Sequence, residues 1–174
     1  MPGSEPEPMR RFDAAQGPRI VGPQDGKTVD LGPCGARFLI WGEESGGGFS
    51  LVEQPIPPHH LAAPLHRHTR EDEYSYVIAG RLGAQLGSDV VHANPGDLVF
   101  KPRGQWHTFW SAGDEVCRIL EIISPGGFEH FFDEFAAGLI SAPEQRARYG
   151  SELDLDSIAG LCRRHGLIYP ATAG

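Results

Sequence analysis

Short apolar runs separated by turn residues dominate the chain between about residue 19 and residue 123. Several runs alternate apolar and polar positions, and most are rich in aromatic or β-branched residues, which is typical of strands. The connections combine Gly, Pro, Asn and Asp, as in Asn94-Pro95-Gly96-Asp97, and such combinations form turns. We therefore predict strands over 36–42, 49–54, 73–80, 81–87, 89–93, 97–102, 106–110 and 115–123.

A helical pattern replaces the strand pattern in the last part of the chain. Within 126–138, four aromatic residues recur at helical spacing and predict a helix laid against the strands: Phe128, Phe131, Phe132 and Phe135. One or two further turns are expected at 143–149. A third helix should follow, capped by Asp154 or Asp156 and ended by Gly166.

Composition supports one domain built mainly from short strands. The chain has 174 residues, of which 23 are Gly and 15 are Pro, and this amount of turn chemistry favours an all-β sandwich or barrel. We expect the barrel over 19–125 and a mobile N-terminal tail over 1–18, which is rich in Pro, Glu and Gly. Residues 126–174 are expected to form helices and a tail packed on the barrel.

Charge and cysteine usage exclude several classes of protein. The formal net charge of −8 argues against nucleic acid or an anionic membrane as partner, because both need a basic surface. No run approaches the ~18 apolar residues of a membrane span, and no signal peptide is recognisable. The three cysteines, Cys34, Cys117 and Cys162, are too widely spaced to indicate disulfides or a thiolate zinc site. These features predict a cytoplasmic protein.

The stretch LHRHTREDEYSYVIAG, residues 65–80, carries the strongest functional signal. His66 and His68 differ by two positions, so on a strand both imidazoles project from one face. Glu73 follows after a four-residue gap, and a turn at 69–72 can direct it back toward the histidine pair. Further along, GDLVFKPRGQWH adds His107. Imidazole nitrogens and a carboxylate oxygen form a mixed site that suits a divalent first-row metal.

These two blocks resemble the cupin motifs, G-x5-H-x-H-x3,4-E-x6-G and G-x5-P-x-G-x2-H-x3-N. From His66 to His107 the spacings match, and Gly80, Gly96, Pro102 and Gly104 occupy motif positions. Two positions depart from the motifs, because His60 stands at the first Gly and Ser111 at the closing Asn. Neither position is a ligand in the family. The resemblance implies the family fold, a double-stranded β-helix barrel of the jelly-roll type, here followed by a short helical C-terminal segment.

The resemblance also implies the ligand set: His66, His68, Glu73 and His107 would hold one divalent metal per chain, of type Fe, Mn, Ni, Co, Cu or Zn. Glu71 and Asp72 are alternatives to Glu73, but the six-residue distance from Glu73 to Gly80 favours Glu73, and the other two are interpreted as solvated loop charges. A degenerate cupin whose polar cluster binds no metal is the alternative to this site.

Strand alternation extends the candidate site to a substrate pocket. Ser75 and Val77 follow Glu73 on one strand face, and Phe109 shares the face of His107. Trp41 and Phe49, aromatic residues of two earlier strands, are further candidates.

The family includes many activities, so the function is a hypothesis. The first hypothesis is an oxygenase acting on a small aromatic or enol-type molecule, similar to small quercetin-dioxygenase-like cupins, with Glu73 as ligand and proton acceptor. The alternatives are a metal-dependent isomerase or polyketide cyclase, and a metal- or ligand-binding protein without turnover. Barrels of this family commonly pair through a sheet, which implies a homodimer.

Overall fold

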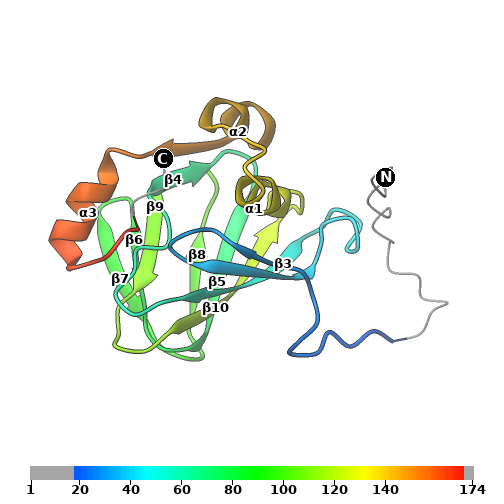
Figure 1. Ribbon diagram of the computed structural model, residues 1–174, viewed down its shortest axis with the longest axis horizontal. Coiled ribbons are helices and arrows are strands. Elements are labelled where there is room, and N and C mark those ends of the chain that lie inside the picture. Colours follow the sequence, from blue (N-terminus) through cyan, green and yellow to red (C-terminus); the bar gives the residue numbers. More distant parts are fainter. Residues whose placement is uncertain (1–17, 171–174) are drawn as a thin grey trace, which may run out of the picture.

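The computed structural model describes residues 18–170, which form a barrel of two antiparallel sheets (Figure 1). All but the last residue of the expected tail, 1–18, lies outside the described residues. The six-stranded sheet has the order β1-β2-β3-β10-β5-β8. Its strands are β1 (Thr28–Asp30), β2 (Gly35–Ile40), β3 (Ser50–Ile56), β5 (Asp72–Ala79), β8 (Leu98–Lys101) and β10 (Cys117–Ser124).

The five-stranded sheet has the order β11-β4-β9-β6-β7. Its strands are β4 (Leu65–His68), β6 (Leu82–Leu86), β7 (Asp89–Ala93), β9 (His107–Ser111) and β11 (Ser151–Asp154). With short helices after residue 125, this arrangement confirms the predicted all-β jelly-roll class. Each of the eight strands predicted from the alternation is present, within a few residues of its expected bounds.

Three strands, β1, β4 and β11, lie outside the predicted ranges, although the spacing of His66 and His68 is the one expected of a strand at β4. The segment of β11 reads SELD, which lacks the apolar alternation of a half-buried strand. It is a strand because it pairs antiparallel with β4, where Leu153 lies opposite His66. The C-terminal segment therefore contributes a strand to the barrel in addition to helices that pack on it.

Three helices follow the barrel strands: α1 (Glu129–Ala136), α2 (Ala142–Tyr149) and α3 (Ser157–His165). Figure 1 shows α1 and α2 at the top of the view and α3 at its left. Asp156 stands at the N-cap of α3 as predicted, but its side chain makes no capping hydrogen bond. Gly166 ends α3 in the left-handed conformation, with φ of 66°, as expected of a helix-terminating glycine.

Three motif glycines occupy backbone conformations that other residues avoid. Gly80, Gly96 and Gly104 have φ of 71°, 97° and 80°. A Cβ atom is strained at such angles, so glycine is the residue that these turns require. The turns fix where β5 ends and where β8 and β9 begin, and thereby position the strands that carry the candidate ligands.

The interior between the sheets has an apolar end and a polar end. The apolar end is one cluster that includes Ile56, Val77, Leu82, Phe109 and Ile119. At the other end the buried side chains are polar or charged: His66, His68, Glu73, Ser75, Lys101, His107 and Glu121. Buried polar groups on this scale are costly unless they are paired or bind a ligand, so this end of the barrel is the candidate functional site.

All three cysteines are free thiols. None of the helices within residues 18–170 has the length and apolar character needed to cross a membrane.

Candidate metal centre

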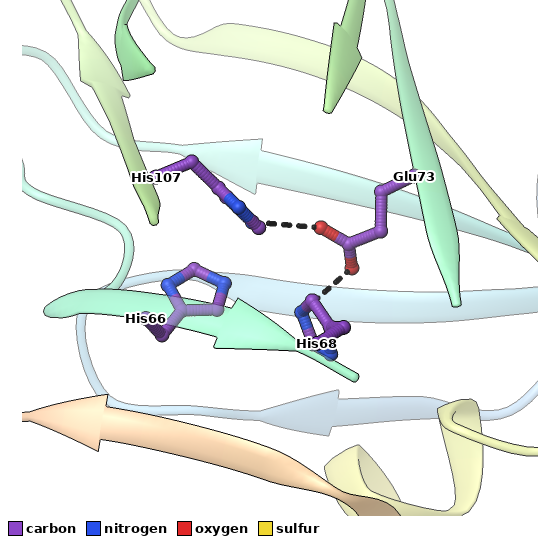
Figure 2. A group of neighbouring side chains, drawn as sticks. All are labelled: His66, His68, Glu73 and His107. Atoms are coloured by element: carbon purple, nitrogen blue, oxygen red, sulfur yellow. Dashed lines mark hydrogen bonds and ion pairs between the residues drawn. The ribbon is translucent and has the colours of Figure 1, made fainter. Parts of the chain in front are cut away.

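Three strands bring the four predicted ligands together. β4 supplies His66 and His68, β5 supplies Glu73 and β9 supplies His107, with His66 opposite His107 in the β4–β9 pairing. Figure 2 shows the three imidazoles and the carboxylate converging on one point. One donor atom from each of the four side chains lies within 4.8 Å of the others, and all four residues are buried.

Backbone carbonyls orient two of the imidazoles. His66 Nδ1 donates to the carbonyl of Pro64 at 2.8 Å, and His107 Nδ1 donates to that of Gln105 at 3.0 Å. Donation from Nδ1 fixes the tautomer that leaves the lone pair on Nε2. His107 Nε2 lies 3.1 Å from Glu73 Oε2 (Figure 2). The side chains are therefore arranged to present Nε2 atoms and a carboxylate to a shared cation.

The electrostatics of the cluster favour the protonation states that bind metal. Burial lowers the pKa of His66 well below its usual value, and the neighbouring histidines lower it further. Burial likewise lowers the pKa of His68 to about 4. Burial alone would raise the pKa of Glu73, but the adjacent Lys101 ammonium holds it well below its usual range. Neutral imidazoles and an ionised carboxylate are the forms in which these groups ligate metals.

His68 supplies an independent indication that a ligand belongs here. Its side chain is 1% exposed, yet among the described residues neither ring nitrogen has a hydrogen-bond partner of acceptable geometry. Nε2 lies 3.4 Å from Glu73 Oε1 (Figure 2). A buried ring nitrogen without a partner is costly, and a divalent metal would satisfy it. The donor set of three histidines and one glutamate fits such a metal.

The two alternative carboxylates lie outside the cluster. Asp72 forms an ion pair with the exposed Arg103, with Oδ2 2.7 Å from Nη2. Glu71 was expected to be a solvated loop charge, and this expectation was wrong, because Glu71 is 7% exposed. Its Oε2 lies 3.9 Å from His68 Nδ1, and burial raises the pKa of its carboxyl to about 7. Glu71 therefore lies behind His68, on the side away from Glu73.

A second group of potential ligands, Glu43, Glu129 and His130, has a structural role. Glu129 is fully buried and both of its oxygens are engaged. Oε1 accepts the N–H of Gly42 at 2.6 Å, and Oε2 accepts that of Gly127 at 2.7 Å. These bonds tie the start of α1 to the loop after β2, and this group is not a candidate metal site.

Sequence reasoning missed two charged residues beside the cluster, Lys101 and Glu121. Each is 1% exposed. Lys101 Nζ lies 3.1 Å from Glu73 Oε2 and 2.7 Å from Glu121 Oε1. Ser75 Oγ donates to Glu121 Oε2 at 2.7 Å. The lysine therefore links the candidate ligand Glu73 to a second buried carboxylate.

A signal for both residues was present in the strand alternation. Lys101 shares the inward face of β8 with Val99, and Glu121 shares that of β10 with Ile119 and Ile123. A charged residue in phase with buried apolar neighbours predicts a buried ion pair or a functional site.

A cavity of about 240 Å³ reaches the cluster, and His66 and Glu73 form part of its wall. The aromatic residues predicted to hold a helix against the barrel line the opposite side: Phe128, Phe131, Phe132 and Phe135. The Phe128 ring lies edge-on to His68, with ring centroids 4.3 Å apart. The start of α1 therefore covers both the cavity and the candidate metal centre.

The predicted pocket residues divide between the cavity and the core. Phe109 lines the cavity. Ser75 donates a hydrogen bond to Glu121, which lines the cavity, and Val77 belongs to the apolar core cluster. Trp41 stacks on Phe38 with ring centroids 4.2 Å apart, and Phe49 is 38% exposed. The structure does not bring Trp41 or Phe49 to the cavity wall.

Comparisons with known proteins agree with this architecture. Residues 52–123 match the model of the cupin domain. No curated protein sequence is significantly similar to the chain. Among solved structures, KdgF from Halomonas sp. is 18% identical with a TM-score of 0.53, and the alignment covers 62% of this chain and 91% of that one. An RmlC-like cupin from Shewanella frigidimarina is 16% identical with a TM-score of 0.54, covering 63% and 92%.

A predicted oxalate decarboxylase from Thermotoga maritima is 22% identical with a TM-score of 0.50, covering 53% of this chain and 80% of that one. Identities of this size show a shared fold and do not transfer an activity. The motif spacing, the two sheets, the domain match and the shared fold agree. The chain therefore contains a cupin domain at residues 52–123.

Proposed function

We propose that this protein is a metal-dependent oxygenase that acts on a small, largely apolar organic molecule of aromatic or enol type. One observation carries the proposal: His66 and Glu73 belong both to the candidate metal centre and to the wall of the cavity. A molecule held in the cavity would therefore lie beside the metal ligands. Convergent polar groups at one end of an apolar pocket are the usual form of a small-molecule site.

The cavity wall favours an uncharged substrate. Among the described residues that line it there is no lysine or arginine, and Lys101 is engaged by two carboxylates. A phosphate or carboxylate group in this cavity that does not reach the metal would be desolvated without a cationic partner, which is strongly unfavourable. The aromatic side chains of α1 instead suit a flat apolar body, and this argues against sugar phosphates and dicarboxylates as substrates.

The ligand residues would contribute to the chemistry in two ways. His66, His68, Glu73 and His107 would hold a divalent metal, which when bound polarises an enol or carbonyl oxygen and, if redox-active, supports reaction with dioxygen. Glu73 can also accept a proton from an enol that lies in the cavity, because its carboxylate forms part of the wall.

Oxygen consumption tests this proposal. The metal-free protein would be loaded with iron, manganese, nickel, cobalt, copper or zinc and presented with one- and two-ring enols and hydroxyketones. We expect oxygen uptake that requires both substrate and a redox-active metal and that is lost in His107→Ala. Turnover that proceeds equally well without oxygen would contradict an oxygenase.

A metal-dependent isomerase or cyclase is the second candidate, favoured by Glu121. This residue lines the cavity and provides a carboxylate there in addition to Glu73. Two carboxylates around one substrate can remove a proton at one atom and return it at another. Anaerobic conversion of substrate, supported by zinc and weakened in Glu121→Gln, would identify this activity. Binding of metal and ligand without any turnover would identify a binding protein.

We further expect a homodimer. The outer face of β5 and β8 exposes large apolar side chains, of which Tyr76, Ile78, Leu98 and Phe100 are 38–51% exposed. β8 is also an edge strand of its sheet, and apolar edges of this kind favour pairing. Light scattering should give the mass of two chains, and Leu98→Asp should shift it toward one. A single-chain mass of the unmodified protein over a wide concentration range would contradict a dimer.

A further inference from the structure

The cavity has a polar patch that the candidate metal centre does not explain. Gln54, on β3, forms part of the wall and is 3% exposed. Its side-chain oxygen Oε1 is fully buried, and among the described residues it has no hydrogen-bond partner. A buried amide oxygen without a partner is unfavourable. Such a group is usually satisfied by water or by a ligand.

Sheet register places Gln54 beside Glu121 on the inward face. Gln54 lies opposite Ile119 in the β3–β10 pairing, and Glu121 lies two residues further along β10. Residues in this diagonal relation are within reach of one another or of a shared ligand. The Glu121 carboxylate is already held by Lys101 and Ser75. Gln54 is therefore the side chain of this pair that is free to bind a group in the cavity.

The volume of the cavity limits the size of a ligand that could supply a hydrogen-bond partner for Gln54. An apolar cavity of about 150 Å³ holds benzene, and sites for drug-sized ligands begin near 300 Å³. The cavity of about 240 Å³ lies between these sizes. It therefore suits one or two fused rings and is too small for a three-ring flavonol without movement of α1.

We propose that Gln54 is a specificity-determining residue that receives a hydroxyl group of an uncharged, one- or two-ring ligand. This inference rests on the proposed function only in taking the cavity as the substrate site. A hydroxyl suits Gln54 in either orientation of its amide, because it can donate to the oxygen or accept from the nitrogen. The ring system then lies against the phenyl groups of α1, and the second carboxylate, Glu121, lies beside the hydroxyl.

The test compares 2-naphthol with 2-methylnaphthalene, two probes of similar shape that differ in the hydroxyl. Binding of each to the metal-free protein is followed by calorimetry or by probe fluorescence. In Gln54→Leu we expect the Kd of 2-naphthol to rise about tenfold, as for loss of one buried hydrogen bond. The Kd of 2-methylnaphthalene should stay unchanged or fall, because the new side chain is apolar.

Gln85→Leu is the matched control. Gln85 also has a buried side-chain oxygen that lacks a hydrogen-bond partner within residues 18–170, but it is not one of the described residues that line the cavity. Both probes should bind Gln85→Leu as they bind the unmodified protein. Gln54→Met provides a second variant should Gln54→Leu fold poorly, and the melting temperature of each variant checks folding.

The outcomes separate this inference from the proposed function. Suppose that Gln54→Leu and Gln54→Met raise the Kd of both probes equally, or change neither Kd. Gln54 then does not recognise the hydroxyl group, and the inference is overturned, while the cavity remains a binding site. If neither probe binds the unmodified protein, the cavity is not a site for such molecules, and the inference falls with it. Because the assay uses metal-free protein, a failure of the metal centre alone would leave its result unchanged.

Discussion

Glu73→Gln is expected to strip the protein of its divalent metal, while Glu121→Gln retains it. Glu73 contributes the carboxylate of the four-residue cluster, where Oε2 lies 3.1 Å from His107 Nε2. Changes to residues that only orient a ligand typically cost about 10–100-fold in metal affinity. Removal of a ligand oxygen should therefore cost more than about 100-fold, and His107→Ala should cost a similar amount.

Glu121→Gln is a close control for this loss of charge. Both carboxylates are buried and both contact Lys101 Nζ, at 3.1 Å for Glu73 and 2.7 Å for Glu121. Only Glu73 belongs to the cluster of donor atoms. Elemental analysis of purified protein should find about one metal per chain in the unmodified protein and in Glu121→Gln, and calorimetric titration gives the affinities.

Glu71→Gln completes the comparison, because Glu71 lies 3.9 Å from His68 on the other side of the ring. Loss of metal in Glu71→Gln together with full retention in Glu73→Gln would assign the carboxylate ligand to Glu71. Full metal content in both Glu73→Gln and His107→Ala would instead remove the proposed centre.

Lys101→Met should lower the free energy of unfolding by about 3–5 kcal/mol, the usual cost of removing one partner from a buried ion pair. Lys101 is 1% exposed, and its ammonium is the cation that faces both Glu73 and Glu121. These two carboxylates outweigh burial and raise the pKa of Lys101, so the residue is charged at neutral pH. Without it, two buried carboxylates lose their common partner.

A double variant separates this explanation from a simple loss of packing. Replacing both partners of a buried pair by apolar residues of similar volume is often neutral or stabilising. Lys101→Met combined with Glu121→Leu should therefore unfold at a higher urea concentration than Lys101→Met alone. Urea unfolding of the metal-free proteins at neutral pH measures both values. If the second substitution lowers stability further by an independent amount, the two residues are not coupled.

The local pattern of the chain identified eight of the eleven strands and the turns between them, whereas the set of four candidate ligands came from the resemblance to the cupin motifs. Alternation of period two places His66 and His68 on one strand face whatever the partner strand is. The glycines at 80, 96 and 104 indicate turns because glycine readily adopts the positive φ angles that turns need, and the structure has such angles at all three. These features depend on neighbours within a few residues, and for that reason sequence reasoning recovers them.

Tertiary structure alone decided which groups face one another across the barrel. β11 is a strand only because it pairs with β4, and the phenyl groups of α1 cover the cavity only because that helix folds back over it. The sequence shows Lys101 and Glu121 as charged residues on buried strand faces. Their position beside Glu73 depends on the pairing of β5 with both β8 and β10. Alternation encodes which face of a strand is buried, whereas the partners of that face are set by contacts between segments distant in sequence.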